Sequence, residues 1–533
     1  MNNNPITVQE GATGILTITG HGGLEIYHPD CNMDEAIGLL REFQELRDLR
    51  GVALKDNYRV GMRDWYPCIV SQLFWYVFFS FVKYRPLFEK QVAGTACFKP
   101  ITKGWFAILL GILNARNRNT FRQRVHDIAW KTHNRTICNR GPWDMAFFRF
   151  ARKDFRSVEI LETLGSEGLR VLQAVPAPGT FEIFRSILRK EPYYYFAQPN
   201  KTINGSAFRG SYALNGLDPV KRALFSAAIR LVETTLTTCM SELAEHKKCF
   251  LRAGIRGFYG FDDVNTYLFP LLYAARDLGL PTIGHQHGAY VKRHAGYMMY
   301  GIQEFEWFDK VVVWGDYWRE KLLREAPVHP PQRWVVGCNK LKIPYADAAS
   351  EKSPQSSGRE KSSSPPRRVL IPYEFLADTT TVGRYITKLS MLGYEVFFRP
   401  RRDESLESQV DAYGLDDTTR AALNVEGGPL DAALLAKIDI VAGTMTTLVY
   451  ELLPAGKIIW YLETPYQHLL DLVEEGLAHR IRLEDLKPPG QMPASLLEPT
   501  RVAPEHLFGR VSLQDSIRAH VLPSMSGQKA SAQ

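Results

Sequence analysis

The sequence predicts an α/β protein in which two parallel-sheet domains face a central crevice. Short apolar runs alternate with segments of helical periodicity, which is typical of the strand, helix, strand units of parallel sheets. A polar segment divides this pattern into two stretches. The chain of 533 residues is also longer than one hydrophobic core usually serves. We therefore expect two such domains, preceded by an additional helical region rich in aromatic and basic residues.

Each stretch supplies strands and helices in alternation. In the first, helices are predicted at 265–279 (NTYLFPLLYAARDLG) and 316–326 (DYWREKLLREA), and strands at 280–284 (LPTIG), 310–315 (KVVVWG) and 333–338 (RWVVGC). In the second, strands are predicted at 368–374, 394–400, 439–443 and 457–462, and helices at 380–393, 432–438 and 446–456. Sheets of this kind bind ligands at the carboxyl ends of their strands.

Composition sets the domain boundaries. Residues 346–368 (ADAASEKSPQSSGREKSSSPPRR) are rich in serine, proline and charge, which is the composition of a disordered linker. We expect an N-terminal extension over 1–156, a Rossmann-like domain over 157–345, this linker over 346–368, a second Rossmann-like domain over 369–510, and a disordered tail over 524–533.

The charge distribution points to an anionic partner. The net charge is +8, and between residues 101 and 156 twelve Lys or Arg stand against three Asp. The aromatic run at 66–84 is short for a membrane span, so with the basic segment at 104–124 it favours an anchor lying on anionic lipid. The alternative is a core helix beside a solvated basic face. The predicted membrane-facing residues are Trp75, Phe78, Trp105, Arg116, Arg118, Arg122 and Arg124.

Targeting signals and cysteines indicate the compartment. The N-terminal MNNNPITVQEGATG lacks the basic and apolar regions of a secretory signal. The seven cysteines show no C-x-x-C spacing, and an odd number cannot all pair within one chain. We therefore expect a cytoplasmic protein that associates peripherally with a membrane.

A histidine-rich loop follows the predicted strand at 280–284. In GHQHGAYVKRH, residues 284–294, glycines let the chain turn out of the strand and leave the imidazoles at the crevice. Imidazole serves as a general base or, when protonated, as a partner for phosphate. The candidate catalytic residues are His285 and His287, and the candidate acceptor-binding residues are Gln286, Lys292 and Arg293.

Two carboxylates precede the helix that leads to this loop. Asp262 and Asp263 follow a strand-like segment in GFYGFDDVNTYLF, so either is a candidate base for an acceptor hydroxyl. Capping of the following helix is an equally good explanation. No third ligand accompanies the histidines and the chain has no D-x-D triplet, so we expect neither a metal nor a cofactor.

The second stretch offers groups suited to phosphate. Arg399 and Arg401 end a strand in EVFFRPRRDES, and the fork of a guanidinium matches phosphate oxygens. In VAGTMTTLVYELLPAGK a strand end, a glycine and three threonines precede a helix, which is typical of a phosphate cradle and equally of ordinary helix capping. The candidate nucleotide-binding residues of this loop are Gly443, Thr444, Thr446, Thr447 and Glu451.

Residues 250–480 resemble the bacterial surface-polysaccharide glycosyltransferases of the GT-B fold. The resemblance rests on YLFPLLYAARDLGLPTIGHQHGAY, FDKVVVWGDYWREKLL and RWVVGCNKL, and then on FRPRRDE and GTMTTLVYELLPAGK. The similar proteins include capsule and lipopolysaccharide Kdo transferases, polysialyltransferases and CDP-glycerol glycerophosphotransferases. Where their pattern has His after Pro, this chain has Arg401.

The resemblance implies a metal-independent transferase that moves a sugar from a nucleotide-activated donor, such as CMP-Kdo, to a surface-polysaccharide or lipid-linked glycan acceptor at the inner membrane. The second domain would bind the donor nucleotide, with Glu451 at the ribose, and the first would bind the acceptor. Two alternatives stay open. One is a CDP-glycerol-type glycerophosphotransferase, and the other is a noncatalytic polysaccharide-assembly or nucleic-acid-binding protein. No nucleic-acid-binding motif is present, so no nucleic-acid partner is expected.

Overall fold

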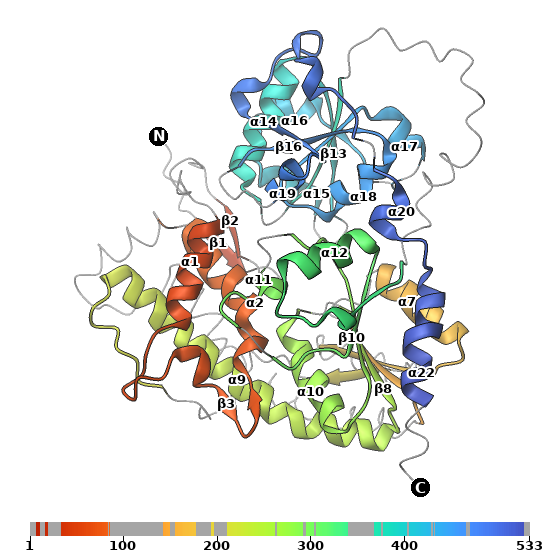
Figure 1. Ribbon diagram of the computed structural model, residues 1–533. Helices are drawn as coiled ribbons and strands as arrows, with labels where there is room; N and C mark the ends of the chain where they lie inside the picture. The colour runs from red at the N-terminus through yellow and green to blue at the C-terminus, as the bar shows by residue number, and fades with distance from the viewer. Residues whose placement is uncertain are drawn as a thin grey trace.

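Two parallel sheets form two domains, and a helical N-terminal region lies against the first of them (Figure 1). The computed structural model describes residues 7–10, 16–19, 33–83, 85, 142–149, 155–176, 193–196, 210–261, 264–291, 295–302, 305–338, 367–374, 377–401, 405–427, 430, 432–464, 469–500 and 502–526. Two short antiparallel pairs join β1 (Thr7–Glu10) to β2 (Leu16–Thr19) and β3 (Arg59–Val60) to β4 (Arg63–Asp64).

The first sheet has seven parallel strands in the order β11-β10-β9-β8-β5-β6-β7. They are β5 (Met145–Phe148), β6 (Val171–Pro176), β7 (Tyr193–Phe196), β8 (Gly257–Phe261), β9 (Thr282–His285), β10 (Lys310–Val313) and β11 (Trp334–Val336). The chain extends the sheet from β5 first to one side and then, from β8 onward, to the other. The switch point between β5 and β8 is where a doubly wound sheet binds its ligand.

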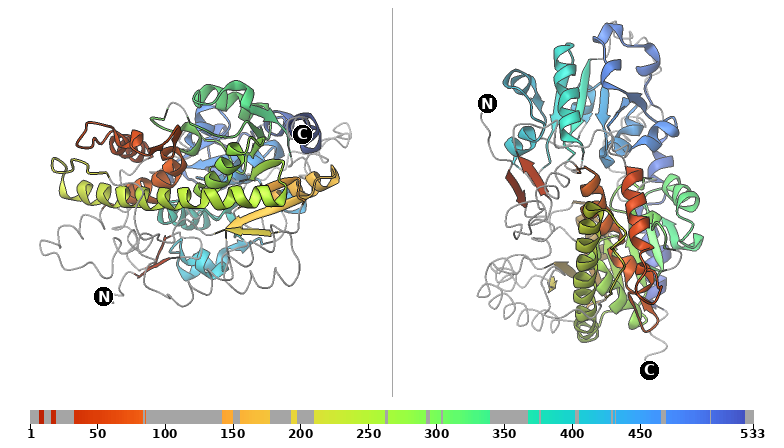
Figure 2. Two further views of the ribbon diagram at one scale, coloured as in Figure 1. Left: turned by 90° about the horizontal axis from the view of Figure 1, so that it is seen from below. Right: turned by 90° about the vertical axis from the view of Figure 1, so that its left-hand side faces the viewer.

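The helices of the first domain connect these strands. They are α7 (Phe155–Ser166), α9 (Pro219–Ala253), α10 (Phe269–Asp277), α11 (Ala295–Met298) and α12 (Asp316–Glu325). Helix α9 crosses the molecule in the left view of Figure 2. It begins at Asp218, whose carboxylate accepts the Lys221 N–H at 2.9 Å, and ends at Gly254, whose φ of 69° suits glycine.

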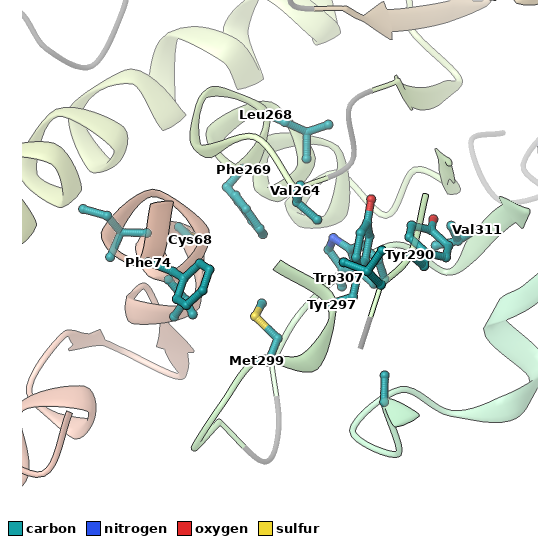
Figure 3. Close-up of a cluster of buried hydrophobic side chains, with 14 of the residues drawn as sticks. Cys68, Phe74, Val264, Leu268, Phe269, Tyr290, Tyr297, Met299, Trp307 and Val311 are labelled. Atoms are coloured by element: carbon teal, nitrogen blue, oxygen red, sulfur yellow. The ribbon is translucent and has the colours of Figure 1, made fainter. Parts of the chain in front are cut away.

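The N-terminal helical region packs on α9 and α10 through aromatic side chains. It comprises α1 (Met33–Gln44), α2 (Val70–Leu73), a π-helical turn (Phe74–Phe79) and α3 (Ser80–Lys83). The ring of Phe78 lies 5.3 Å from that of Phe43 in α1 and 6.0 Å from that of Phe225 in α9. Figure 3 shows Phe74 in one buried cluster with Phe269 of α10.

This packing contradicts the predicted membrane-facing position of Phe78. Phe78 is fully buried, because apolar burial against α1 and α9 stabilises it in the core, and Trp75 is half-buried beside Phe74. The buried side chains of the 66–83 segment thus fit the core helix that the sequence left as an alternative, and the membrane anchor as a whole stays a prediction. Trp105, Arg116, Arg118, Arg122 and Arg124 lie outside the described residues. Within the described ranges, no helix is both long and apolar enough to cross a membrane.

The second sheet has six parallel strands in the order β14-β13-β12-β15-β16-β17. They are β12 (Arg368–Pro372), β13 (Glu395–Arg399), β14 (Asn424–Val425), β15 (Ile440–Gly443), β16 (Ile458–Leu462) and β17 (His479–Ile481). The connecting helices are α14 (Thr379–Met391), α15 (Leu406–Asp411), α16 (Asp417–Ala422), α17 (Ala432–Lys437), α18 (Thr447–Leu452) and α19 (Leu470–Glu474). The switch point of this sheet lies between β12 and β15.

The C-terminal segment leaves the second domain and returns to the first (Figure 1). It forms α20 (Pro504–Phe508), α21 (Leu513–Ser516), a π-helical turn (Ile517–Val521) and α22 (Leu522–Ser526). Leu513, Ile517 and Val521 are buried in one apolar cluster with Tyr259 of β8 and Val312 of β10. The segment therefore completes the core on one face of the first sheet.

The predicted alternation of strands and helices is confirmed from α10 to β16, and with it the predicted α/β class with two parallel-sheet domains. The sequence did not reveal β5, β6 or β7. The first sheet thus begins with β5, before the predicted domain boundary at 157, because a strand of four apolar residues inside a basic segment gives little periodic signal. The predicted linker and tail lie outside the described residues, apart from Arg367 and Arg368 at the end of the linker and Ser524–Ser526 of the tail, which belongs to α22.

Candidate functional site

The loops after β9 and β15 touch, so the carboxyl edges of the two sheets face each other. The Ala289 N–H donates to Thr447 Oγ1 at 3.2 Å. A Cβ on the neighbouring Gly288 would lie 3.5 Å from the same oxygen, so the two loops are within van der Waals distance there. We call this region the junction and define it as residues 286–289 of the first domain and 444–451 of the second.

Gln286 fixes the shape of the histidine loop. Its side chain is fully buried, its Oε1 accepts the Trp314 backbone N–H at 2.9 Å, and its Nε2 donates to the Gly288 carbonyl at 2.9 Å. The Gln286 carbonyl in turn accepts the indole N–H of Trp314 at 3.0 Å. Gln286 is thus held inside the first domain by these hydrogen bonds, and its predicted contact with an acceptor stays a prediction.

Replacing Gln286 tests whether its side chain holds the histidine loop in shape or contacts an acceptor. We expect Gln286→Leu to lower the free energy of unfolding by about 2 kcal/mol, because the buried Trp314 N–H loses its acceptor. Gln332→Leu is the matched control, since the exposed Gln332 side chain should change stability by less than about 0.5 kcal/mol. Urea unfolding measures both. An unchanged stability for Gln286→Leu would mean that these hydrogen bonds do not stabilise the fold, and would favour a direct contact of Gln286 with an acceptor.

The two candidate catalytic histidines occupy different environments. His285, at the end of β9, is fully buried, and its Nδ1 lies 2.8 Å from the Tyr259 hydroxyl. It therefore reaches a substrate only if the loop rearranges. His287 is half-buried, its ring lies 6.5 Å from that of Phe261, and its Nδ1 lies 3.5 Å from the Tyr297 hydroxyl. Of the two, His287 is the better placed for proton transfer at the junction.

A carboxylate from the second domain fills the predicted phosphate cradle. Glu374, two residues after β12, is 5% exposed and accepts the backbone N–H groups of Thr444, Met445 and Thr446 at 2.8–2.9 Å. The Thr444 hydroxyl also donates to it. Burial raises the pKa of Glu374, while these donors act in the opposite direction.

The predicted contacts of Thr444 and Thr446 with a donor phosphate stay predictions, since in this structure Glu374 takes the place expected for the phosphate. Their amides are occupied by Glu374, and the Thr446 side chain caps α18 by accepting the Leu448 N–H at 3.2 Å. Gly443 allows this arrangement, since a Cβ there would lie 3.0 Å from Glu374 Oε1 and 2.9 Å from a methyl of Val449. The loop after β15 is thus a closed structural unit. Its sequence signal was ambiguous because capping and phosphate binding use the same residue types.

Arg156 joins the two domains beside the histidine loop. From the first turn of α7, its guanidinium donates to the His287 carbonyl and forms an ion pair with Glu451 of α18. The guanidinium carbon also lies 5.1 Å above the centre of the Trp314 ring. Both side chains of the ion pair are nearly buried, at 13% and 12% exposure. Glu451, predicted at the donor ribose, is here engaged by Arg156.

Arg399 and Arg401 lie at the carboxyl end of β13, on the edge of the second sheet that also carries the loop after β15. Arg399 ends β13 opposite Pro372, and its carbonyl accepts the Tyr373 N–H at 2.9 Å. The side chain of the buried Gln409 makes two hydrogen bonds to the backbone of Arg401: it accepts the Arg401 N–H at 2.7 Å and donates to the Arg401 carbonyl at 2.9 Å. The two half-buried arginines are thus held near the loop that carries Glu374, and their contact with phosphate stays a prediction.

A buried ionic cluster adds a second set of contacts between the domains. Lys321 of α12 is 1% exposed and lies 2.5 Å from Asp471 Oδ2 and 3.1 Å from Glu475 Oε1. Tyr317 donates to Glu475, and the Tyr450 hydroxyl lies 3.3 Å from Asp471. Burial opposes the charge on Lys321, but the two carboxylates raise its pKa above the usual range.

Several predicted residues lie outside the described residues: Asp262, Asp263, Lys292 and Arg293. Among the described residues, no three His, Cys, Asp or Glu side chains gather as metal ligands. A pocket of about 370 Å³ lies away from the junction, at the β3–β4 turn. Its cation, Arg63, is paired with Asp277 and Glu306.

The sequence missed three residues that organise the junction or the other contacts between the domains. Arg156 was one charge among many in the basic segment, and Glu374 appeared as the end of a predicted strand. Lys321 stands inside the predicted helix at 316–326, and lysine is a residue type that is mostly exposed. A carboxylate two residues after the first strand of a parallel sheet was the available signal for Glu374, since loops there point toward the ligand side.

No protein-family model matches the chain, and no curated protein matches its sequence. Similar solved structures include MurG from Acinetobacter baumannii, with 15% identity and a TM-score of 0.40, covering 72% of this chain and 100% of that one. UDP-GlcNAc 2-epimerase from Methanocaldococcus jannaschii in complex with UDP-GlcNAc and UDP has 10% identity and a TM-score of 0.43, covering 71% and 99%. A glycosyltransferase from Rickettsia africae has 11% identity and a TM-score of 0.38, covering 73% and 99%.

At these identities and TM-scores the likenesses carry no argument about activity. The fold class rests on the strand pairing itself. Two doubly wound parallel sheets whose carboxyl edges face one another form the GT-B arrangement that the sequence predicted.

Proposed function

We propose that this chain transfers a sugar from a nucleotide-activated donor to a glycan or lipid-linked acceptor at the junction. The observation that carries the proposal is the contact of the loops after β9 and β15, which brings together the carboxyl edges of two sheets. Both sheets have their switch points at this edge, and doubly wound sheets bind ligands there. The sequence resemblance to surface-polysaccharide glycosyltransferases supports the same reading.

We assign the steps of group transfer from a phosphate to His287 of the junction and to residues of the loops around it. The acceptor oxygen forms a bond to the anomeric carbon of the donor sugar, and the bond from that carbon to the phosphate oxygen breaks. The leaving phosphate keeps the electron pair, and cationic side chains stabilise its charge. His287 is the described candidate to take the hydroxyl proton, with Asp262 and Asp263 as the other candidates. Arg399 and Arg401 are the proposed partners of the donor in the second domain.

A thermal-shift panel tests the proposal. The purified chain is heated with CMP, CDP, UDP, GDP and a short oligonucleotide, each in turn. We expect one nucleotide to raise the melting temperature, since a ligand at a hundred times its Kd stabilises the native state by about 2.7 kcal/mol. Arg401→Ala should reduce that rise, and Arg420→Ala, at an exposed ion pair of the same domain, should leave it intact.

Other results would favour other functions. A shift with the oligonucleotide alone would favour the nucleic-acid-binding alternative and overturn the transferase. If a cytidine nucleotide binds, product analysis with CMP-sugar and CDP-glycerol donors separates sugar transfer from glycerophosphate transfer, because the two reactions attach different groups to the acceptor.

A further inference from the structure

We propose that Arg156 binds a phosphate of the donor nucleotide, and that Glu451 holds its guanidinium until the donor arrives. This inference rests on the proposed function and adds a phosphate-binding residue in the first domain. Neither the sequence pattern nor the resemblance singled out Arg156. Its position and its contacts both support the role.

The position of Arg156 is that of a ligand-binding residue. It lies in the first turn of α7, the helix that follows β5, and β5 borders the switch point of the first sheet. Its guanidinium reaches across to the second domain, where α18 follows β15, a strand that borders the switch point of the second sheet. Arg156 is thus a side chain through which the ligand-binding edges of the two sheets meet.

The guanidinium is held in place for a planar, anionic partner. Its central carbon lies 5.1 Å from the centre of the buried Trp314 ring, and the indole and backbone N–H groups of Trp314 are both bonded to Gln286. One arm of the fork is fixed by the His287 carbonyl. An arginine held by a ring contact and a hydrogen bond loses little side-chain freedom on binding, and its fork matches phosphate oxygens as it matches a carboxylate.

Glu451, which now pairs with the Arg156 guanidinium, is a partner that a phosphate can replace. Glu451 supplies a single negative charge from the opposite domain, so any opening of the junction separates the pair. A nucleotide phosphate carries more charge and more acceptor oxygens than one carboxylate. Exchange of Glu451 for the donor phosphate therefore keeps Arg156 paired while freeing the Glu451 carboxylate for the ribose hydroxyls. Donor binding in the second domain would in this way change the contacts of Arg156, whose guanidinium also bonds the His287 carbonyl of the first domain.

The experiment compares nucleotide with nucleoside binding. Kd values are measured by calorimetry for CMP, CDP, UDP and GDP, and for cytidine, uridine and guanosine. We expect Arg156→Gln to weaken the bound nucleotide roughly tenfold, as for loss of one charge-assisted hydrogen bond, and to change nucleoside binding by less than about twofold. Glutamine keeps a donor for the His287 carbonyl. Arg156→Lys, which keeps the charge and loses the fork, should lie between the two.

Two further variants complete the design. Glu451→Gln removes the competing charge and keeps a ribose acceptor, so nucleotide affinity should rise about threefold or more. Tyr317→Phe is the matched control, because it removes another contact between the domains without touching the histidine loop, and it should affect nucleotide and nucleoside equally.

The outcomes separate the two proposals. If Arg156→Gln weakens nucleotide and nucleoside by the same factor, Arg156 only joins the domains and the inference is wrong. A loss of both affinities in Glu451→Gln would overturn the exchange and leave Glu451 as a ribose ligand alone. If the unaltered chain binds a nucleotide that Arg156→Gln binds equally well, only the inference fails. If the unaltered chain binds none of the four nucleotides, the proposed function fails and the inference with it.

Discussion

Replacing Glu374 with alanine is expected to destabilise the loop between β15 and α18 by about 3 kcal/mol or more. The carboxylate accepts three backbone N–H groups and one hydroxyl at a buried position, and each buried donor left without an acceptor costs about 1–3 kcal/mol. Glu374→Gln should lose less, about 2 kcal/mol, because its amide oxygen still accepts while its NH2 group faces the donors.

Native-state hydrogen exchange of the peptide covering residues 440–452 measures this effect locally, and urea unfolding measures it for the domain. Glu463→Ala is the matched control. Glu463 is a carboxylate of the same domain that pairs with Arg480 and Arg482 near the surface, so its loss should cost at most about 1 kcal/mol. Equal protection of residues 440–452 in Glu374→Ala and the unaltered chain would mean that other contacts hold the loop.

Replacing Lys321 with methionine is expected to lower the free energy of unfolding by about 3–5 kcal/mol. Lys321 is the buried cation between α12 and α19, and its removal leaves the Asp471 carboxylate, whose side chain is 3% exposed, without its ammonium partner. We expect the loss to appear first as separation of the two domains, because the cluster consists of contacts between them.

A double variant identifies the cause. Lys321→Met with Asp471→Leu replaces the buried pair by apolar side chains, which is often neutral, so it should recover most of the lost stability in urea unfolding. Lys248→Met serves as the control, because Lys248 and Glu245 form an exposed pair worth at most about 0.5 kcal/mol. If the double variant is no more stable than Lys321→Met, the loss of stability comes from changed packing and not from the unpaired Asp471 carboxylate.

The sequence predicted the architecture better than it predicted the site. Strands such as β10 and β16 are continuous apolar runs bounded by glycine or charge, and such runs are visible without tertiary information. The loop after β15 was located correctly, but its contact with Glu374 was not predicted. Glu374 lies seventy residues away along the chain, and nothing in the local pattern indicates that its carboxylate meets the Thr444 amide.

Long-range pairing also explains the other differences. The aromatic run at Phe74–Phe79 has the composition of an interfacial segment, and packing against side chains of α1, α9 and α10 makes it part of the core. Arg156 and Glu451 are ordinary surface residue types in a sequence. Their role at the junction arises from the way two separate sheets face each other, which a one-dimensional pattern does not contain.

The return of the C-terminal segment to the first sheet makes the second domain an insertion within the first. Both of its ends lead back to the same body, one through residues 339–366 and the other through the residues before α20. Two covalent tethers limit how far the second domain can separate from the first. Close packing reinforces the second tether, since a Cβ on Gly315 would lie 2.5 Å from the Leu507 carbonyl oxygen. Removal of the C-terminal residues from α21 onward would therefore damage the core of the first domain and leave the sheet of the second domain intact.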